Sequence, residues 1–535
     1  SPSRCHRCAG RSRSKRRRPA CRLLEGLPTA GVSAPIQLTS HAGDDTEAAW
    51  SPDGAMIAFQ RESDGDVDLC VLDVESGAVT TLVDGPGHAL HPAWSPDGET
   101  IVYSFAHFTS TAAEGIESGY NLFAVRSDGG QPRRLTEGQV RDYTPAFARD
   151  GDAIVFSSTR GLEEAGAALM RIPPGGGEPA GFDLEQGRDT GFVEPDFSPD
   201  GSLIVCSYIP NFRENWTLRL LRAGEPEEQF GLTSPEAAMY APAWSPDGRL
   251  IACTGYRAGD PGWGIYLVEV ESGLSMRLDT GPGNARSPAW SPEGDRLVFE
   301  SNRGGSYDLY VVETPQTKFG PPPDVPADAT VLSLEVDPNE GTVRDGSDHS
   351  NEIVTAGEPE IDETGIAFNP GDFIAAEQPG GMAFGDDAFC VRADVSIREV
   401  TGDVQIIAVG DYPEHRQGWQ LFLNDEGYLY FNSRDAEGTF ISARSDLPLG
   451  PGGRLLIVAL RRDTGRVELW LDGLRQQRTG TGATMRYGEA AQVRIGSQHS
   501  GGMDFAGTVH ALEILNQAPS DEAIRAPHLK EFVQQ

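Results

Sequence analysis

The sequence has few lysines and no long apolar run, and each shortage narrows what the chain can do. Three of its 44 basic residues are lysines, and its 80 acids leave a formal net charge of −36. Such a strongly acidic body repels nucleic acid and anionic membrane surfaces, so a nucleic-acid function is not expected. No apolar stretch reaches the roughly 18 residues that a membrane-spanning helix needs, so no membrane span is predicted.

Cysteines are also few. Cys5 and Cys8, beside His6, form a Cys-x-x-Cys pair, but no second pair follows at a spacing typical of a zinc finger. Residues 1–34 are predicted to be a basic, disordered leader, in which no apolar signal-peptide core can be read. Four other cysteines lie in apolar strand patterns and are expected to be buried free thiols: Cys70, Cys206, Cys253 and Cys390.

Short catalytic motifs are missing as well. The chain has no Gly-x-Ser-x-Gly elbow, phosphate-binding loop, dinucleotide fingerprint or His-Glu-x-x-His pair. We therefore assign no catalytic residue and expect a protein that is not an enzyme.

A phrase of the form aromatic-Ser-Pro-Asp-Gly occurs six times in the first 300 residues, each time before an apolar strand. The third copy has Ala148-Arg149 in place of Ser-Pro, and the sixth has Glu293 in place of Asp. Successive acidic residues of these turns are 44, 53, 50, 47 and 46 residues apart. A period of this length with several strands per unit is typical of propeller blades. The six turn acids are Asp53, Asp97, Asp150, Asp200, Asp247 and Glu293.

The sixth unit lacks its last strand, and residues 36–39 supply a spare copy of that strand before the first unit. We expect residues 36–39 to pair with the strand at 308–312 and close the ring, because closure removes exposed strand edges. The repeats predict a six-bladed β-propeller over residues 35–318.

These repeats resemble the TolB-like propeller family, and the run from Ser301 to Val311 is a close match to one of its phrases. The resemblance implies a bacterial, periplasmic or secreted binding module whose ring mouth receives a protein or peptide. Residues just before the innermost strand's Pro-Ala-Trp phrase lie at the mouth of such rings. Here the candidate ligand-binding residues are Glu47, His91, Tyr143, Thr144, Glu194, Tyr240, Arg286 and Ser287.

Beyond a Pro-rich linker at 319–328, the spacing of strands changes. Alternating strands over residues 329–518 predict a two-sheet β-sandwich jelly roll, so the whole chain is expected to be all-β. Phrases such as 462–473 resemble the laminin-G-like branch of the concanavalin A-like lectin/glucanase superfamily. The resemblance implies a glycan or another envelope component as a partner. Residues 519–535 are interpreted as a C-terminal tail that could form a short helix.

Enzymes related to this superfamily, the laminarinase-type glycoside hydrolases, carry Glu-x-Asp-x-x-Glu, and residues 335–340 match that string. Pro338 and Asn339 interrupt the strand that would aim the acids into a cleft, so we interpret the string as a turn. The alternative function is glycoside hydrolysis by this domain, with the propeller as an accessory module. Calcium is the one cofactor candidate, with hard oxygen ligands from Asp345, Asp348 and Asn351.

Overall fold

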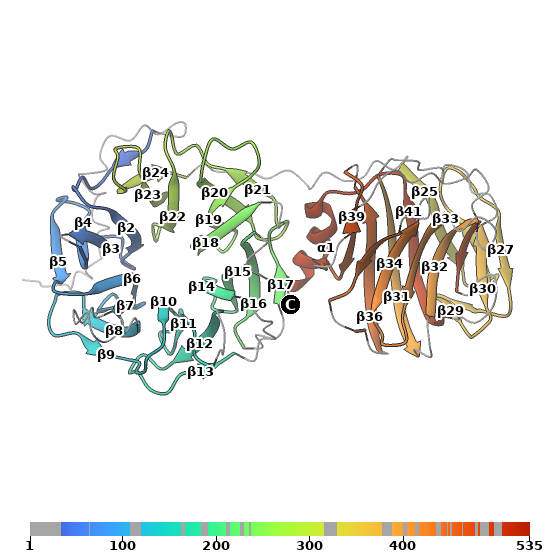
Figure 1. Cartoon of the computed structure of the whole chain (residues 1–535), viewed down its shortest axis with the longest axis horizontal. Coiled ribbons are helices and arrows are strands. Elements are labelled where there is room, and N and C mark those ends of the chain that lie inside the picture. Colours follow the sequence, from blue (N-terminus) through green and yellow to red (C-terminus); the bar gives the residue numbers. More distant parts are fainter. Residues whose placement is uncertain are drawn as a thin grey trace, which may run out of the picture.

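A computed structural model describes most of residues 34–534, as two β-rich domains (Figure 1). The basic leader with Cys5, Cys8 and His6, and the linker at 319–328, lie outside the described residues. Within 34–534, the structure leaves out residues 64, 107–118, 162–165, 183–190, 210–214, 225–228, 235–236, 315–328, 377–387, 400–403, 412–416, 435–439, 447, 450–451, 463, 477–479, 482–491 and 497–504.

The first domain is a six-bladed β-propeller, as predicted, with four antiparallel strands in each blade. The innermost strands, in blade order, are β2 (Asp45–Trp50), β6 (His88–Trp94), β10 (Asp142–Phe147), β14 (Gly191–Phe197), β18 (Ala238–Trp244) and β22 (Ala285–Trp290). The second strands are β3 (Met56–Ser63), β7 (Thr100–Ala106), β11 (Ile154–Ser158), β15 (Leu203–Ile209), β19 (Leu250–Tyr256) and β23 (Arg296–Ser301).

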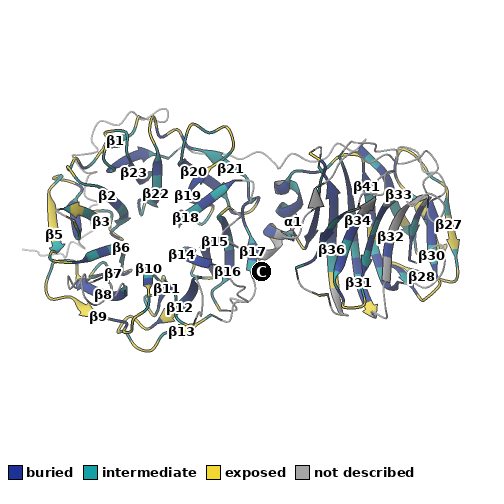
Figure 2. Ribbon diagram, in the orientation of Figure 1, coloured by how far each residue is buried: buried dark blue, intermediate teal, exposed yellow. Residues whose placement is uncertain are grey.

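The outermost strand is the least buried strand of each blade. The third strands are β4 (Asp66–Asp73), β8 (Asn121–Arg126), β12 (Ala168–Ile172), β16 (Thr217–Arg222), β20 (Gly264–Glu269) and β24 (Asp308–Glu313). The outermost strands are β5 (Val79–Val83), β9 (Arg133–Arg134), β13 (Ala180–Gly181), β17 (Gln229–Gly231), β21 (Ser275–Arg277) and, in the sixth blade, β1 (Ile36–Gln37). Figure 2 shows exposed residues on β5 and β9, whereas the second strands are mostly buried.

Hydrogen bonds within the repeated turn explain why the phrase recurs. Ser51 Oγ donates to the Asp53 carboxylate at 2.8 Å, which holds the turn between the first two strands. In the sixth blade, where Glu293 replaces the aspartate, Ser291 Oγ donates to Asp295 at 3.0 Å instead. The same Ser–Asp bond recurs at Ser95–Asp97, Ser198–Asp200 and Ser245–Asp247.

The ring closes as the sequence predicted. Strand β1 pairs antiparallel with β24, with Ile36 opposite Val311. The Leu38 N–H then donates to the Leu309 carbonyl at 2.8 Å, and the Leu309 N–H donates to Thr39 Oγ1 at 3.0 Å. The N-terminal segment therefore covers the edge of β24 that would otherwise be exposed.

The second domain is a two-sheet sandwich, which confirms the predicted jelly roll. One sheet contains β26 (Thr342–Asp345), β25 (Thr330–Asp337), β41 (Ala506–Leu515), β31 (Phe389–Glu399), β36 (Gly452–Arg461), β37 (Arg466–Leu471) and β38 (Leu474–Arg475), with β28 (Glu360–Asp362), β29 (Gly365–Phe368) and β39 (Gly480–Thr481) attached. The other contains β27 (Ile353–Ala356), β30 (Phe373–Ala376), β40 (Gln492–Ile495), β32 (Val404–Asp411), β33 (Gln417–Leu423), β34 (Leu429–Arg434) and β35 (Phe440–Arg444).

Apolar residues fill the space between the two sheets. On β33, Trp419, Leu421 and Leu423 are buried, while the alternating Gln420 and Phe422 are only partly buried. Trp419 belongs to this cluster, whereas Trp470 is buried in a separate cluster that includes Ile524 of the C-terminal helix. The four cysteines expected to be free thiols are indeed free and buried.

One helix, α1 (Asp521–Gln534), lies between the two domains (Figure 1). Its Leu529 packs into the apolar cluster of the fourth and fifth blades, and its Ile524 packs with Trp470 of the jelly roll. Asp521 accepts hydrogen bonds from Ser234 of the propeller and from Arg462 of the jelly roll. We call α1 the bridging helix, because it contacts both domains with apolar and polar side chains.

Candidate binding site on the propeller axis

The innermost strand of each blade contains a β-bulge at the position nearest the ring axis. In β2, for example, the pairing register with β3 shifts between Thr46 and Ala49. The residue inside each bulge has a φ between 47° and 56°, a left-handed conformation that is uncommon for residues other than glycine. These six axial residues are Glu47, His91, Thr144, Glu194, Ala241 and Ser287.

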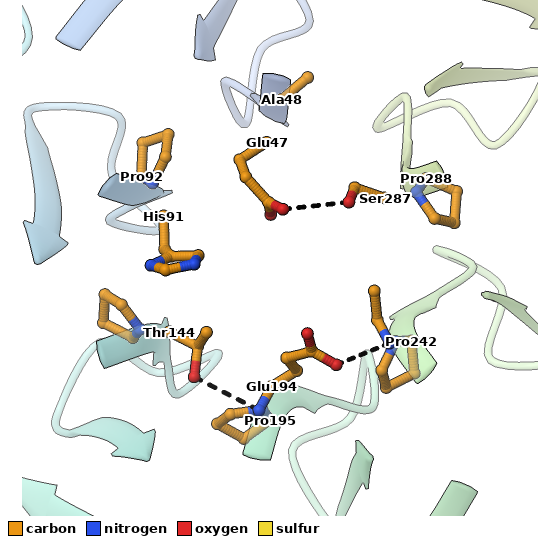
Figure 3. A pocket seen from close by; sticks show the side chains of 12 residues that line it. Glu47, Ala48, His91, Pro92, Thr144, Glu194, Pro195, Pro242, Ser287 and Pro288 are labelled. Carbon is orange, nitrogen blue, oxygen red and sulfur yellow. Dashed lines mark hydrogen bonds between the residues drawn. The ribbon is translucent and has the colours of Figure 1, made fainter. Parts of the chain in front are cut away.

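The six axial residues line one cavity of about 130 Å³ on the propeller axis. The residue that follows each of them completes the wall, and five of these six followers are prolines. Figure 3 shows Glu47, His91 and Glu194 extending into the cavity from three different blades. The structure thus brings together five sequence-predicted residues, together with Ala241: Glu47, His91, Thr144, Glu194 and Ser287.

Three other predicted residues do not line the cavity, because each precedes the bulge and packs elsewhere. Tyr143 lies beside His91, with 6.5 Å between ring centroids. Tyr240 packs edge-on against Trp263 at 5.3 Å. Arg286 forms an ion pair with Glu300 at 2.9 Å. These three residues belong to the layer behind the cavity wall.

A second ring of polar residues supports the axial residues, and our sequence reasoning missed it. Each lies on the second strand of its blade, seven residues after the turn acid, within an otherwise apolar run. That regular polar position was the available signal. The supporting residues are Gln60, Ser104, Ser157, Ser207, Thr254 and Glu300.

Most supporting residues accept the backbone N–H of the axial residue in the next blade. Thr254 Oγ1 accepts the Ser287 N–H at 2.9 Å, and Ser207 Oγ accepts the Ala241 N–H at 3.0 Å. Gln60, Ser157 and Glu300 do the same for His91, Glu194 and Glu47. These bonds join neighbouring blades around the ring and satisfy donors that the bulges withdraw from the strand ladder.

Carboxyl groups dominate the electrostatics of the cavity. Ser287 Oγ lies 3.1 Å from a Glu47 oxygen and 3.5 Å from a Glu300 oxygen. Burial, together with the neighbouring Glu47 carboxylate, raises the pKa of Glu300 to about 8, although the Arg286 guanidinium opposes this shift. Burial also raises the pKa of Glu47 and Glu194 above the ordinary value for glutamate.

His91 is a neutral imidazole at physiological pH. Burial lowers its pKa to about 4, despite the nearby Glu194 carboxylate. Its Nδ1 is buried and has no hydrogen-bond partner among the described residues. The cavity therefore offers carboxylates, hydroxyl groups and one uncharged imidazole nitrogen.

The candidate calcium residues in the jelly roll form a hydrogen-bonded loop. The Asp345 carboxylate accepts the Ser333, Ser347 and Asn351 N–H groups, as well as the Ser347 hydroxyl and the Asn351 side-chain amide. Burial raises the pKa of Asp345, but these hydrogen bonds outweigh it, so the pKa is lowered from its ordinary value. Asp348 is exposed. Across the part of the chain that the structure describes, no group of three or more His, Cys, Asp or Glu side chains is placed to hold a metal ion.

The string at 335–340 is a strand end followed by a turn, as interpreted from the sequence. Strand β25 ends at Asp337, whose carboxylate accepts the N–H groups of Asn339 and Glu340. Glu335 is paired with Arg344 at 2.8 Å.

Fold and site together define a protein with a propeller and a lectin-like sandwich, and comparisons with known proteins agree. Residues 182–320 match the model of the TolB beta propeller domain, and residues 371–525 match that of the concanavalin A-like lectin/glucanases superfamily. The chain therefore joins a TolB-like propeller to a domain of the concanavalin A-like superfamily. No helix in the described part of the chain is long and apolar enough to cross a membrane.

Among similar proteins, an uncharacterized protein of Agrobacterium fabrum is 32% identical over 170 residues, which are 30% of this chain and 54% of that protein. A TolB homolog of Chlorobium chlorochromatii is 30% identical over 125 residues, 23% of this chain and 26% of the homolog. The chain thus spans about half of the first relative and about a quarter of the second. A solved structure of a putative TolB from Agrobacterium tumefaciens is 18% identical, with a TM-score of 0.39, covering 52% of this chain and 93% of that one.

Proposed function

We propose that this chain is a periplasmic or secreted recognition protein without catalytic activity. Its propeller binds a polar group of a protein, peptide or small ligand in the axis cavity, and its jelly roll binds a glycan or another envelope component. The observation that carries the proposal is the convergence of the axial side chains on one cavity. TolB-like and lectin-like domains both fit a binding protein.

The strained geometry of the axial residues supports a binding role. A left-handed φ at a non-glycine residue costs on the order of 1–3 kcal/mol and persists only where its surroundings impose it. Six such residues point polar or small side chains at one axis. A role in packing alone does not call for carboxylates and an imidazole at these positions, because burying them is unfavourable.

The bridging helix supports a joint role for the two domains. It holds contacts on both sides, through Leu529 and Ile524, so the two binding surfaces keep a fixed separation. Two weak sites held on one frame bind a surface that carries both targets more tightly than either site alone.

The test compares ligand retention by the native chain with retention by the double variant His91→Ala/Glu194→Gln. Both proteins, immobilised, are exposed to a defined library of peptides and metabolites, and bound molecules are identified by mass spectrometry. We expect the native chain to retain ligands that the double variant loses. The variant Glu99→Gln, which alters an exposed acid of the same propeller, is the control. Equal retention by all three proteins would contradict a binding role for the cavity.

The glycoside hydrolase alternative receives less support, because Glu335 is paired with Arg344 and Glu340 lies in a turn. A glycan array and a reducing-sugar assay on the full chain separate the two functions. Binding without release of reducing ends supports recognition. Release of reducing ends that Glu335→Gln abolishes would establish the hydrolase.

A further inference from the structure

The axis cavity has more acidic side chains than basic ones. Glu47 and Glu194 extend into it, and Glu300 lies directly behind Glu47. Arg286 pairs with Glu300 at 2.9 Å, whereas neither Glu47 nor Glu194 forms an ion pair among the described residues. Arg286 acts on Glu47 only from a distance, so two cavity carboxyl groups lack an ion pair at contact distance within the described structure.

Protein donors occupy only part of these two carboxyl groups. One Glu194 oxygen accepts the Ala241 N–H at 2.7 Å and the Ser207 hydroxyl at 2.6 Å. One Glu47 oxygen accepts the Ser287 hydroxyl at 3.1 Å. The second oxygen of each group has no described protein donor and remains for a ligand. A ligand that donates hydrogen bonds and carries positive charge would complement both groups.

The shape of the cavity favours an organic cation over a bare metal ion. The described residues contain no group of three or more acidic, imidazole or thiol side chains placed to surround a metal. The cavity of about 130 Å³ is large compared with one ion, and its wall is built mainly of prolines and alanine between the polar groups. An aliphatic chain that ends in a charged group matches such a lining.

His91 supplies a third acceptor. Its ring extends into the cavity (Figure 3), and because Nδ1 is buried, Nε2 is the ring nitrogen left to face a ligand. A neutral imidazole nitrogen accepts an N–H donor in one of its tautomers. Glu47, Glu194 and His91 approach from three blades, and an ammonium group has three donors to share among them.

We propose that the axis cavity binds one primary ammonium group, presented by a lysine side chain or by the N-terminus of a partner polypeptide. This inference rests on the proposed binding function of the cavity and names its ligand chemistry. Glu47 and Glu194 pair with the charge, the neutral His91 imidazole accepts one hydrogen bond, and the proline-lined wall contacts the aliphatic part of the ligand.

Isothermal titration of the full chain with three blocked or free peptides tests the proposal. The first is acetyl-Gly-Gly-Lys-Gly-Gly-amide, the second is the same peptide with the lysine Nε acetylated, and the third is Gly-Gly-Gly-Gly-amide with a free N-terminus. We expect either the first or the third peptide to bind. Tighter binding of the first identifies a lysine side chain as the source of the ammonium group, and tighter binding of the third identifies an N-terminus. Acetylation of the lysine ligand should weaken binding about tenfold or more, because a charged hydrogen bond is lost.

Variants locate the site. Glu194→Gln and Glu47→Gln should each weaken binding of the preferred peptide about tenfold, whereas the exposed Glu99→Gln should leave it within about twofold. Thermal unfolding confirms that each variant is folded. Failure of both the first and the third peptide to bind, or binding of the acetylated peptide as tight as that of the preferred one, would overturn the proposal. So would binding of calcium chloride alone that depends on Glu194, with no binding of any peptide.

The test also separates this inference from the proposed function. If the peptides fail to bind while library ligands are still retained through His91 and Glu194, the ammonium proposal falls and the binding function stands. If neither peptides nor library ligands depend on these residues, both fall.

Discussion

The Glu300 carboxylate accepts the backbone N–H of Glu47 at 3.2 Å, and so joins the last blade of the propeller to the first. This contact lies on the inner side of the ring, whereas β1 closes the outer side by pairing with β24. The first and last blades are therefore joined both near the axis, through Glu300, and at the outer edge, through β1. The contact near the axis involves a titratable group.

Glu300 makes the stability of the propeller depend on pH. Its folded-state pKa of about 8 lies above the ordinary 4.5, so the folded state holds this proton more tightly than the unfolded state. Its contribution is therefore favourable below about pH 4.5 and is lost as pH rises toward 8, at up to about 1.4 kcal/mol per pH unit. Chemical unfolding at several pH values should show that Glu300→Gln reduces this slope, with Glu99→Gln as the control. Parallel curves for native and Glu300→Gln proteins would refute the assignment.

Two serines among the supporting residues differ in their hydrogen bonds and can be compared by mutation. Ser207 Oγ donates to Glu194 and accepts the Ala241 N–H, whereas Ser104 Oγ is buried without a hydrogen-bond partner in the described structure. We expect Ser207→Ala to lower the free energy of unfolding by about 1–3 kcal/mol, because the buried Glu194 carboxyl group loses a hydrogen bond. Ser104→Ala should change it by less than about 0.5 kcal/mol. Urea titrations measure both, and equal effects would argue against the inter-blade role of Ser207.

Ring closure can be tested by trimming the N-terminus at two points. A chain that begins at residue 34 keeps β1, whereas one that begins at His41 loses it together with Leu38 and Thr39, which contact Leu309. The shorter chain should lose a few kcal/mol of stability and associate through the exposed edge of β24. Unfolding curves and size-exclusion chromatography measure the two effects. Similar behaviour of both chains would contradict closure by β1.

The bridging helix should fix the arrangement of the two domains. Leu529→Asp places a charge in the apolar cluster of the fourth and fifth blades, so the helix should detach from the propeller. Small-angle X-ray scattering should then report a larger maximum dimension and a broader range of shapes. Lys530→Ala, at an exposed position of the same helix, should leave the profile unchanged. An unaltered profile for Leu529→Asp would show that other contacts hold the domains.

The Asp345 loop should be independent of calcium. Five donated hydrogen bonds already occupy its carboxylate, so EDTA or added calcium chloride should not shift the melting temperature of the full chain. Asp345→Ala should lower the free energy of unfolding by about 1–3 kcal/mol, because those donors lose their acceptor. A calcium-dependent rise in melting temperature that Asp345→Ala abolishes would restore the metal site.

Repeated local chemistry made the propeller predictable. The Ser-Pro-Asp-Gly turn fixes the blade period, and the missing sixth outer strand predicts closure by residues 36–39. Five polar axial residues could be named because each stands at the same place in its repeat. Tyr143, Tyr240 and Arg286 were misplaced, because alternation along a strand does not reveal how a bulge redirects the neighbouring side chains. Glu300 was missed because a single acid in the run Arg296–Ser301 looks like a solvent-facing residue until its neighbouring blades are known.

The bridging helix could not be placed from sequence, since only its packing partners define it. Leu529 and Ile524 face different domains, and neither contact follows from the helix's own pattern.

At the six axial positions, the left-handed backbone conformation is the same while the chemical nature of the side chain differs. The same bulge forms at all six positions, although their side chains are carboxyl, imidazole, hydroxyl or methyl groups, and hydrogen bonds from the preceding blade hold five of the six backbone N–H groups. Exchanging one of these side chains therefore alters what the ring accepts without rebuilding the ring. The ligand preference of the propeller is therefore open to redesign by substitution of one axial residue at a time.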